Sequence, residues 1–401
     1  MNRRVENILV IIIILCSVSF FRFSALGSLQ KLAEIAGIGI IFLFMLIYLA
    51  YGNHSGVKKQ FIIPIVLIIF SFFTSVLMAE YIHNQGFGKT IYAQRALFYY
   101  LFYILLHQMK IKIRDLEFIF YAFGIIHIVF YLVQYFAYPT IIFDGYVREM
   151  RGTVRIYLSG ADYMVFAMFI SVQKFFRTNQ IKHAVFPFIS LSIFVLLGGR
   201  QTLATMVFTI VLFFLVDRRV QSRGLLITLG LIGAVALFVI FRPVFEALLV
   251  QTHHDAQAAE DYIRIRAAKF FLTDFMEHPL AYITGNGSAY SSSYAREMGK
   301  YAQYRGYYIG DLGLIGNYVE YGLFFVLGVI GICIKALKIK IEENHIYIKY
   351  FFVAVILSLV TGGGFAKTDT ICAIILLLYI LDVSHHSINE KKAIKDNSVE
   401  T

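Results

Sequence analysis

The chain has 401 residues, of which 59% are hydrophobic and 15% are charged, and its formal net charge is +11. A soluble domain carries about 25% charged residues, so the composition excludes an ordinary water-soluble protein. The apolar residues occur in blocks long enough to cross a bilayer and show no strand alternation, which argues against an outer-membrane barrel. Much of the positive charge lies in short segments between these blocks, so it does not indicate a nucleic-acid partner.

Twelve apolar blocks along the chain predict twelve transmembrane helices and an all-α polytopic membrane protein. The first block has no clear small-residue cleavage site, so we interpret it as an uncleaved helix. The predicted spans cover residues 7–22, 35–51, 61–79, 91–107, 116–138, 157–174, 184–199, 201–216, 225–241, 316–335, 347–363 and 367–382.

Short basic segments occupy every second connection, as at residues 58–59, 110–114 and 335–340. Loops rich in Lys and Arg stay in the cytoplasm, so we predict a multi-pass protein of the bacterial inner membrane with both termini cytoplasmic. The predicted organisation is nine helices in residues 1–241, a large periplasmic loop in 242–309 and three helices in 310–383. The polar tail, residues 384–401, is predicted to be disordered and cytoplasmic.

Arginines on the predicted outer side oppose this topology rule and suggest another role. One arginine alone could be an anchor that snorkels to the interface. A group of them predicts a cationic cavity for phosphate, because Arg makes charge-assisted, often bidentate bonds to phosphate oxygens. Arg264 has Glu260 four residues before it as a salt-bridge partner, whereas Arg266 has no such acid and is the preferred functional residue. The outer arginines are Arg95, Arg148, Arg151, Arg155, Arg200, Arg264, Arg266 and Arg305.

The large outer segment begins with a polar stretch whose spacing predicts a helix from about residue 256 to residue 277, stopped by Pro279. A glycine- and serine-rich segment, ITGNGSAYSSSY, and a tyrosine-rich stretch follow. His253 and His254 lie in a predicted exposed loop without further ligands at suitable spacing, so we predict no metal site.

Two acids lie at the entry to the tenth predicted span, GDLGLIGNYVEYG. Asp311 falls at the first turn, where it could cap the helix or act as a general base. Glu320 lies two to three turns deeper, and an acid inside a membrane is a functional candidate by default. Asp162 and His127 could simply bond neighbouring helices. Lys367 and Asp369 bracket the last outer turn and could pair with each other.

Several well-known motifs are missing from the sequence, including GxxxxGK[ST], GxSxG and HExxH. The sequence also lacks an Asp-x-Asp pair of the kind that holds a metal on a nucleotide sugar. A sugar-transferring enzyme with this sequence is therefore predicted to use a lipid-linked donor held by arginines, with no metal and no cofactor.

The segments LLGGRQTLAT around Arg200, RIRAAKFFLTDFMEHPLAYITGNG and GDLGLIGNYVEYGLFF resemble the O-antigen polymerase and ligase superfamily of bacterial glycan assembly. The likeness extends over most of the chain and is mainly architectural. It implies a metal-independent glycosyltransferase with a GT-C-like fold. Such an enzyme takes a glycan from undecaprenyl pyrophosphate and passes it to another lipid-linked repeat unit (polymerase) or to the lipid A core (ligase).

The residues favour a polymerase of O-antigen, capsule or exopolysaccharide over a ligase. Glu320, Tyr321 and Gly322 match the Glu-x-Gly of ligases, but Asp311 and Leu312 stand where ligases have His-Asn. An aspartate at this position resembles polymerases. Leu-Gly-Gly replaces the usual Ser-Gly-Ser before Arg200. A polysaccharide flippase or transporter is the third interpretation, although no inverted repeat is visible, and an acyltransferase lacks a suitable histidine.

The resemblance implies a role for each candidate residue. Arg200 and Arg266, helped by Arg151 and Arg155, would hold the donor pyrophosphate, while Asp311 or Glu320 takes a proton from the acceptor hydroxyl. The outer loop would close over the site and exclude water. The expected partners are the lipid bilayer, the lipid-linked glycan and a chain-length regulator in the membrane. The tyrosines expected to stack on sugars are Tyr301, Tyr304, Tyr307 and Tyr308.

Overall fold

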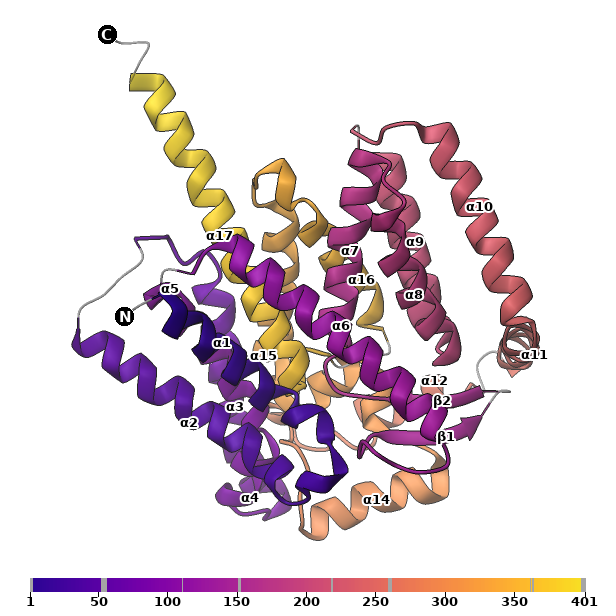
Figure 1. The fold of residues 1–401 in the computed structure, drawn as a ribbon. Coiled ribbons are helices and arrows are strands. Elements are labelled where there is room, and N and C mark those ends of the chain that lie inside the picture. The colour runs from indigo at the N-terminus through magenta and orange to yellow at the C-terminus, as the bar shows by residue number, and fades with distance from the viewer. Residues whose placement is uncertain are drawn as a thin grey trace.

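The structure is a computed structural model that describes residues 3–51, 56–109, 111–150, 153–217, 219–258, 262–360, 362 and 364–397. The described chain is mainly helical (Figure 1). Among the described residues, six helices are long and apolar enough to cross a membrane, as expected of a helical membrane protein. They are α2 (Leu29–Ala50), α3 (Ile62–His83), α6 (Ile113–Ala137), α10 (Arg223–Ile240), α15 (Leu314–Lys338) and α17 (Thr368–Asn397).

Shorter helices occupy the other predicted spans, so twelve crossings and the GT-C-like fold stay predictions. The predicted span 91–107 is divided into α4 (Phe87–Ala93), the 3-10 helix η3 (Arg95–Leu101) and α5 (Phe102–Gln108). The remaining bundle helices are α1 (Arg3–Ser17), α7 (Ala161–Thr178), α8 (Lys182–Leu196), α9 (Arg200–Val216) and α16 (Tyr347–Ser358).

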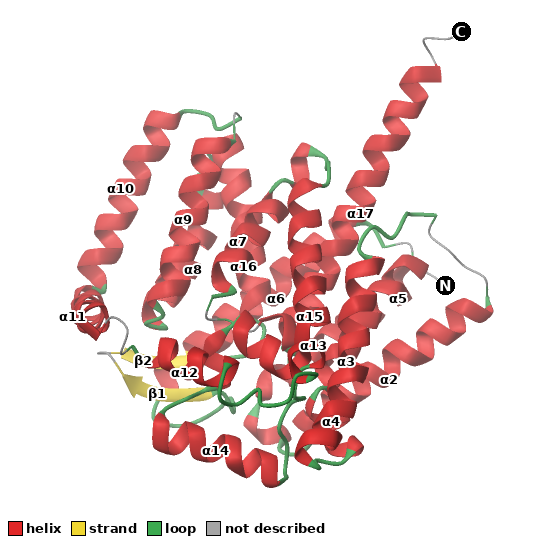
Figure 2. Cartoon of the chain, turned by 180° about the vertical axis from the view of Figure 1, so that it is seen from behind, coloured by secondary structure: helices red, strands yellow, loops and turns green. Residues whose placement is uncertain are grey.

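Helices α3 and α15 pack side by side at the centre of the bundle (Figure 2). A Cβ on Gly328 of α15 would lie 2.7 Å from the Pro64 carbonyl oxygen of α3, so only glycine allows this approach. The first part of α17, residues 371–381, is buried along its whole length. Helix α10 is the opposite case: it lies at the edge of the molecule, and Leu226 is the one buried residue described in it.

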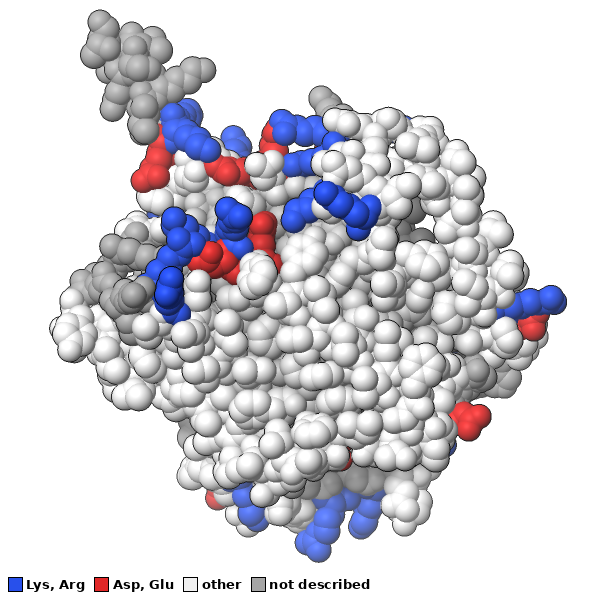
Figure 3. All heavy atoms as spheres, in the orientation of Figure 1, with Lys and Arg blue, Asp and Glu red and all other residues white. Residues whose placement is uncertain are grey.

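Charged side chains gather mainly at two ends of the molecule, and a broad band with few charges separates them, with a small group of charged side chains at its right edge (Figure 3). One end, here the basic end, joins connections far apart in the chain: Arg3 pairs with Asp115 at 2.7 Å, and Lys391 pairs with Glu342 at 2.6 Å. The connections predicted to lie outside meet at the opposite end, here the outer end. Two separate groups of connections are what the predicted topology requires, and the membrane side that each faces stays a prediction.

The outer end contains short elements around a second hydrophobic core. The strands β1 (Tyr146–Met150) and β2 (Thr153–Tyr157) form an antiparallel hairpin. The core of this end includes Phe271, Phe275, Tyr294 and Tyr307. The helical elements are α11 (Arg242–Ala258), α12 (Ile263–Leu272), α13 (Ala281–Thr284), α14 (Ser293–Arg305) and the 3-10 turns η1 (Ser19–Arg22), η2 (Ser24–Leu26), η5 (Ile309–Leu312) and η7 (Gly364–Ala366).

Three expectations about secondary structure are wrong in the described residues, and one element was not predicted. The helix predicted to reach residue 277 ends at Leu272, because the chain turns there and brings Phe275 into the outer core. The tail is helical as far as Asn397, since Ser387 and Lys391 both donate hydrogen bonds to Glu342. Residues 253–254 belong to helix α11 and not to a loop. The hairpin was not predicted, although TVRIY alternates in polarity.

Candidate functional site

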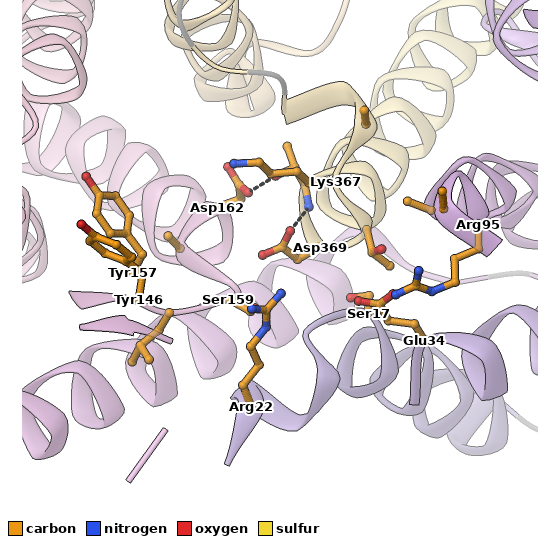
Figure 4. A pocket seen from close by; sticks show the side chains of 17 residues that line it. Ser17, Arg22, Glu34, Arg95, Tyr146, Tyr157, Ser159, Asp162, Lys367 and Asp369 are labelled. Carbon is orange, nitrogen blue, oxygen red and sulfur yellow. Dashed lines mark hydrogen bonds and ion pairs between the residues drawn. The ribbon is translucent and has the colours of Figure 1, made fainter. Parts of the chain in front are cut away.

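A cavity of about 510 Å³ opens at the outer end among η1, α2, η3, the hairpin, α7 and the start of α17 (Figure 4). We call it the outer pocket. Its wall carries three cationic side chains, three acidic side chains and two tyrosines. These residues are Arg22, Arg95, Lys367, Glu34, Asp162, Asp369, Tyr146 and Tyr157.

Arg22 reaches the pocket from an unusual turn. Four consecutive non-glycine residues, from Ser19 to Arg22, have φ between 49° and 56°. The left-handed region costs such residues about 1 kcal/mol or more each. Burial of Phe21, which stacks on Phe123 at 6.1 Å, helps to hold the turn. The Arg22 carbonyl also accepts a 2.6 Å hydrogen bond from the Asp144 amide.

The acids of the outer pocket already have partners that fasten its wall. Glu34 forms an ion pair with Arg95 at 2.5 Å. Asp369 accepts a hydrogen bond from the Gly160 amide at 2.9 Å and another from the Thr370 amide at 3.0 Å. Asp162 accepts a 2.7 Å bond from the Thr370 hydroxyl, which joins α7 to α17 as the sequence suggested. These carboxylates therefore connect the elements that form the pocket wall.

Arg22 and Lys367 differ from the acids. In the described part of the chain, neither side chain makes a hydrogen bond or an ion pair. The suggested pairing of Lys367 with Asp369 does not form, because Asp369 faces the amides at the starts of α7 and α17. Figure 4 shows Arg22 pointing into the pocket, with Asp369 between it and Lys367 in this view.

The hairpin places aromatic and cationic groups on one face. Its register pairs Tyr146 with Tyr157 and Arg148 with Arg155, so all four side chains project to the same side. The Arg155 guanidinium donates a 2.6 Å bond to the Leu197 carbonyl and also contacts the Tyr157 hydroxyl. The hairpin thus connects the outer pocket with the segment that precedes Arg200.

Arg200 is the first residue of α9 and donates a 2.9 Å bond to the Thr252 hydroxyl of α11. Its neighbour Gln201 donates to the Leu357 carbonyl at the end of α16. Two residues further on, the Leu359 carbonyl accepts a 2.8 Å bond from the Leu314 amide at the start of α15. The end of α16 therefore connects the Arg200 segment with the segment that carries Asp311 and Glu320.

Glu320 lies where the outer segment enters α15. Helix α15 is interrupted at Gly322, whose φ is 79°, and the freed carbonyls need new partners. The Asn286 amide donates to the Val319 carbonyl at 2.9 Å, and the Gly287 amide donates to the Glu320 carbonyl at 2.8 Å. We call this contact the glycine interlock. The half-buried Glu320 carboxylate also has the Ser288 hydroxyl as a hydrogen-bond partner.

The other candidates occupy different surroundings. Asp311 lies in η5 and is exposed. Gly313, not Asp311, occupies the N-cap position of α15, so Asp311 does not cap the helix. Arg264 is half-buried and Arg266 is exposed, both on α12. Arg305 lies over the rings of Phe270 and Tyr301, a packing role. Arg151 and Glu260 lie outside the described residues, as do the side chains of His253 and His254.

The tyrosines divide into available and unavailable groups. Tyr304 and Tyr308 are 77% and 56% exposed and could stack on a sugar. Tyr307 is 7% exposed and belongs to the outer core, so its expected stacking role is wrong. Burial, together with the Glu297 carboxylate that accepts its hydrogen bond, raises the pKa of Tyr301 to about 12.

Arg95, which was predicted to bind substrate, lines the outer pocket. The four predicted catalytic residues do not line it; they are Arg200, Arg266, Asp311 and Glu320. Sequence reasoning missed Arg22, because it lies at the end of a predicted span, and Glu34, because it lies near the start of the next. Among the described residues, no group of three or more His, Cys, Asp or Glu side chains is placed to hold a metal ion. No family model matches this sequence, and no curated protein matches it.

Proposed function

We propose that the protein is a bacterial surface-polysaccharide polymerase that joins repeat units carried on undecaprenyl pyrophosphate. One observation supports the proposal: arginines gather at one end of the molecule, in the outer pocket and on the hairpin and α9 segments beside it, next to a band with few charged side chains. A lipid-linked glycan places its chain in the bilayer and its diphosphate at this depth. Arg is suited to that group because its planar fork matches phosphate oxygens.

The reaction would be a displacement at the anomeric carbon of the donor glycan. An acceptor hydroxyl forms the new glycosidic bond while the bond between that carbon and the diphosphate oxygen breaks. Arg200, with Arg155 beside its segment, neutralises the departing diphosphate. Glu320 or Asp311 takes the hydroxyl proton. Glu320 is half-buried with a hydroxyl partner and Asp311 is exposed, so the geometry favours Glu320.

Deleting the gene and profiling undecaprenyl-linked glycans by mass spectrometry tests the proposal. We expect single repeat units to accumulate on the lipid. Long chains stranded on the lipid would instead identify a ligase. A profile identical to that of the parent strain would refute a role in glycan assembly and favour a transporter of another substrate.

Point variants in the deletion strain test the chemistry. We expect Arg200→Ala to lower polymer formation at least about 100-fold, the usual effect of removing a group that stabilises developing charge. Arg266→Ala tests the second arginine of the hypothesis. Arg296→Ala, which removes an exposed arginine of α14, is the matched control and should leave the polymer unchanged. Normal polymer in both Arg200→Ala and Arg266→Ala, at equal expression, would remove the proposed donor site.

A further inference from the structure

The charged groups of the outer pocket differ in the bonds that they already make. By residue, its three cations and three acids balance. Each acid has a partner: Glu34 pairs with Arg95, Asp162 accepts from the Thr370 hydroxyl, and Asp369 accepts from the Gly160 amide. Arg95 also donates to the Tyr92 carbonyl. The side chains of Arg22 and Lys367, which come from different elements, make no hydrogen bond or ion pair with the described residues, although Lys367 interacts with Asp162 through its charge.

We infer that the outer pocket binds an anionic group of a glycan, a carboxylate or a phosphate, between Arg22 and Lys367. The guanidinium and the ammonium supply charge-assisted hydrogen bonds to its oxygens. The inference rests on the proposed function only for the word glycan, since binding of the anion depends on the pocket alone.

The pocket wall fits a sugar that carries this group. Tyr146 and Tyr157 lie edge to face at 5.8 Å on the hairpin, and each is about half exposed. Aromatic faces of this kind pack against sugar rings while their hydroxyls stay in water. A cavity of about 510 Å³ is within the usual size of small-molecule sites.

The turn that carries Arg22 supports the same interpretation. Four left-handed residues in a row are costly, and strained backbone persists where surrounding structure holds it. Here Phe21 anchors the turn in the apolar core, and Arg22, one residue later, faces the pocket. The contacts that hold this strained turn therefore also fix the position of Arg22.

Binding can be measured on the purified full-length chain in detergent. The sequence contains no tryptophan, so Tyr146→Trp places a single tryptophan at the pocket wall, and its emission can be excited separately from that of the tyrosines. The probes are glucuronate, glucose 1-phosphate and glucose. We expect at least one anionic sugar to bind about tenfold or more tighter than glucose, a difference of about 1.4 kcal/mol. Isothermal titration calorimetry of the unmodified chain repeats the comparison without the new side chain.

Variants identify the residues responsible. Arg22→Gln and Lys367→Gln should each weaken the anionic sugar about tenfold and leave glucose unchanged. Arg296→Gln and Lys300→Gln remove exposed cations of α14 and are the matched controls. Unchanged thermal unfolding shows that a variant is folded. Tighter binding of glucuronate identifies a carboxylate site, and tighter binding of glucose 1-phosphate identifies a phosphate site.

Equal affinity for all three probes, or anion binding that survives both Arg22→Gln and Lys367→Gln, would overturn the inference. Either result leaves the proposed function standing if the deletion strain accumulates single repeat units. Anion binding in a protein whose deletion leaves glycans unchanged would refute the function and keep the site.

Discussion

The basic end and the outer end use charge in opposite ways. At the basic end the buried Asp382 carboxylate accepts hydrogen bonds from the Tyr103 hydroxyl, from His107 Nε2 at 3.0 Å and from the Gln60 amide. At the outer end the side chains of Arg22 and Lys367 make no hydrogen bond or ion pair with the described residues, and Lys367 interacts with Asp162 through its charge alone. The basic end is therefore held together by bonds between its polar side chains, whereas two cations of the outer pocket make no such bonds.

The outer end obtains its rigidity from backbone contacts instead. In the glycine interlock, a Cβ on Gly322 would lie 2.3 Å from the Ile283 carbonyl oxygen, and a Cβ on Gly285 would lie 2.4 Å from the Glu320 carbonyl oxygen. The buried Gln85 fastens the next residues by accepting from the Tyr290 amide and donating to the Ser288 carbonyl. The outer end is thus held by backbone contacts to a greater extent than the basic end.

The largest effect should come from breaking the interlock. Gly322→Ala puts a methyl group inside a carbonyl contact at a φ of 79°, so we expect a loss above about 4 kcal/mol and little folded protein. Fluorescence-detected size-exclusion chromatography measures the folded fraction. Gly310→Ala is the control, because no atom lies within 4 Å of its Cβ position. Equal monodisperse peaks for the two variants would show that the backbone contact does not hold this end.

A smaller loss is expected at the basic end. Asp382→Ala leaves the Tyr103 hydroxyl and His107 Nε2 buried without an acceptor, and each such group costs about 1–3 kcal/mol. Thermal unfolding in detergent measures the change. Glu390→Ala removes an exposed acid that pairs with His386 four residues earlier, and should shift unfolding by less than about 0.5 kcal/mol. Equal shifts for both acids would contradict the distinction between the two ends.

The smallest effect concerns pH and the helical tail. The hydrogen bonds from Lys391 and Ser387 hold the pKa of Glu342 below its usual range. A lowered folded-state pKa stabilises the protein above the usual glutamate pKa, and this contribution disappears as pH falls through the folded value. The Lys391 side chain is 71% exposed, so water screens the pair and Lys391→Gln should cost less than about 1 kcal/mol at neutral pH. Thermal unfolding of both proteins should converge in acid, and a gap that persists there would exclude this ion pair as its cause.

Composition and the apolar blocks predict the helices well, because a bilayer fixes both length and hydropathy. The positions of single charges follow less well from sequence. Arg22 and Lys367 are separated by most of the chain, and only the tertiary fold, which brings η1 and the start of α17 to the wall of the same cavity, places them together. The helical spacing also predicted the wrong end for α12, because packing of Phe275 in the outer core ends this helix at Leu272. The glycines of ITGNG and VEYG were visible in the sequence, but their mutual contact was not.

The pairing of α3 with α15 has a consequence for the order in which the molecule is assembled. The chain is synthesised from its N-terminus, so α3 enters the membrane long before its neighbour exists. Its polar side chains need no other helix at that stage, because the buried hydroxyls of Ser71 and Ser75 donate to the Ile68 and Phe72 carbonyls of the same helix. When α15 arrives, Gly328 settles over Pro64 and the interlock forms at its outer turn. The central seam of the bundle is thus among the last to close, and the outer end takes its final shape with it.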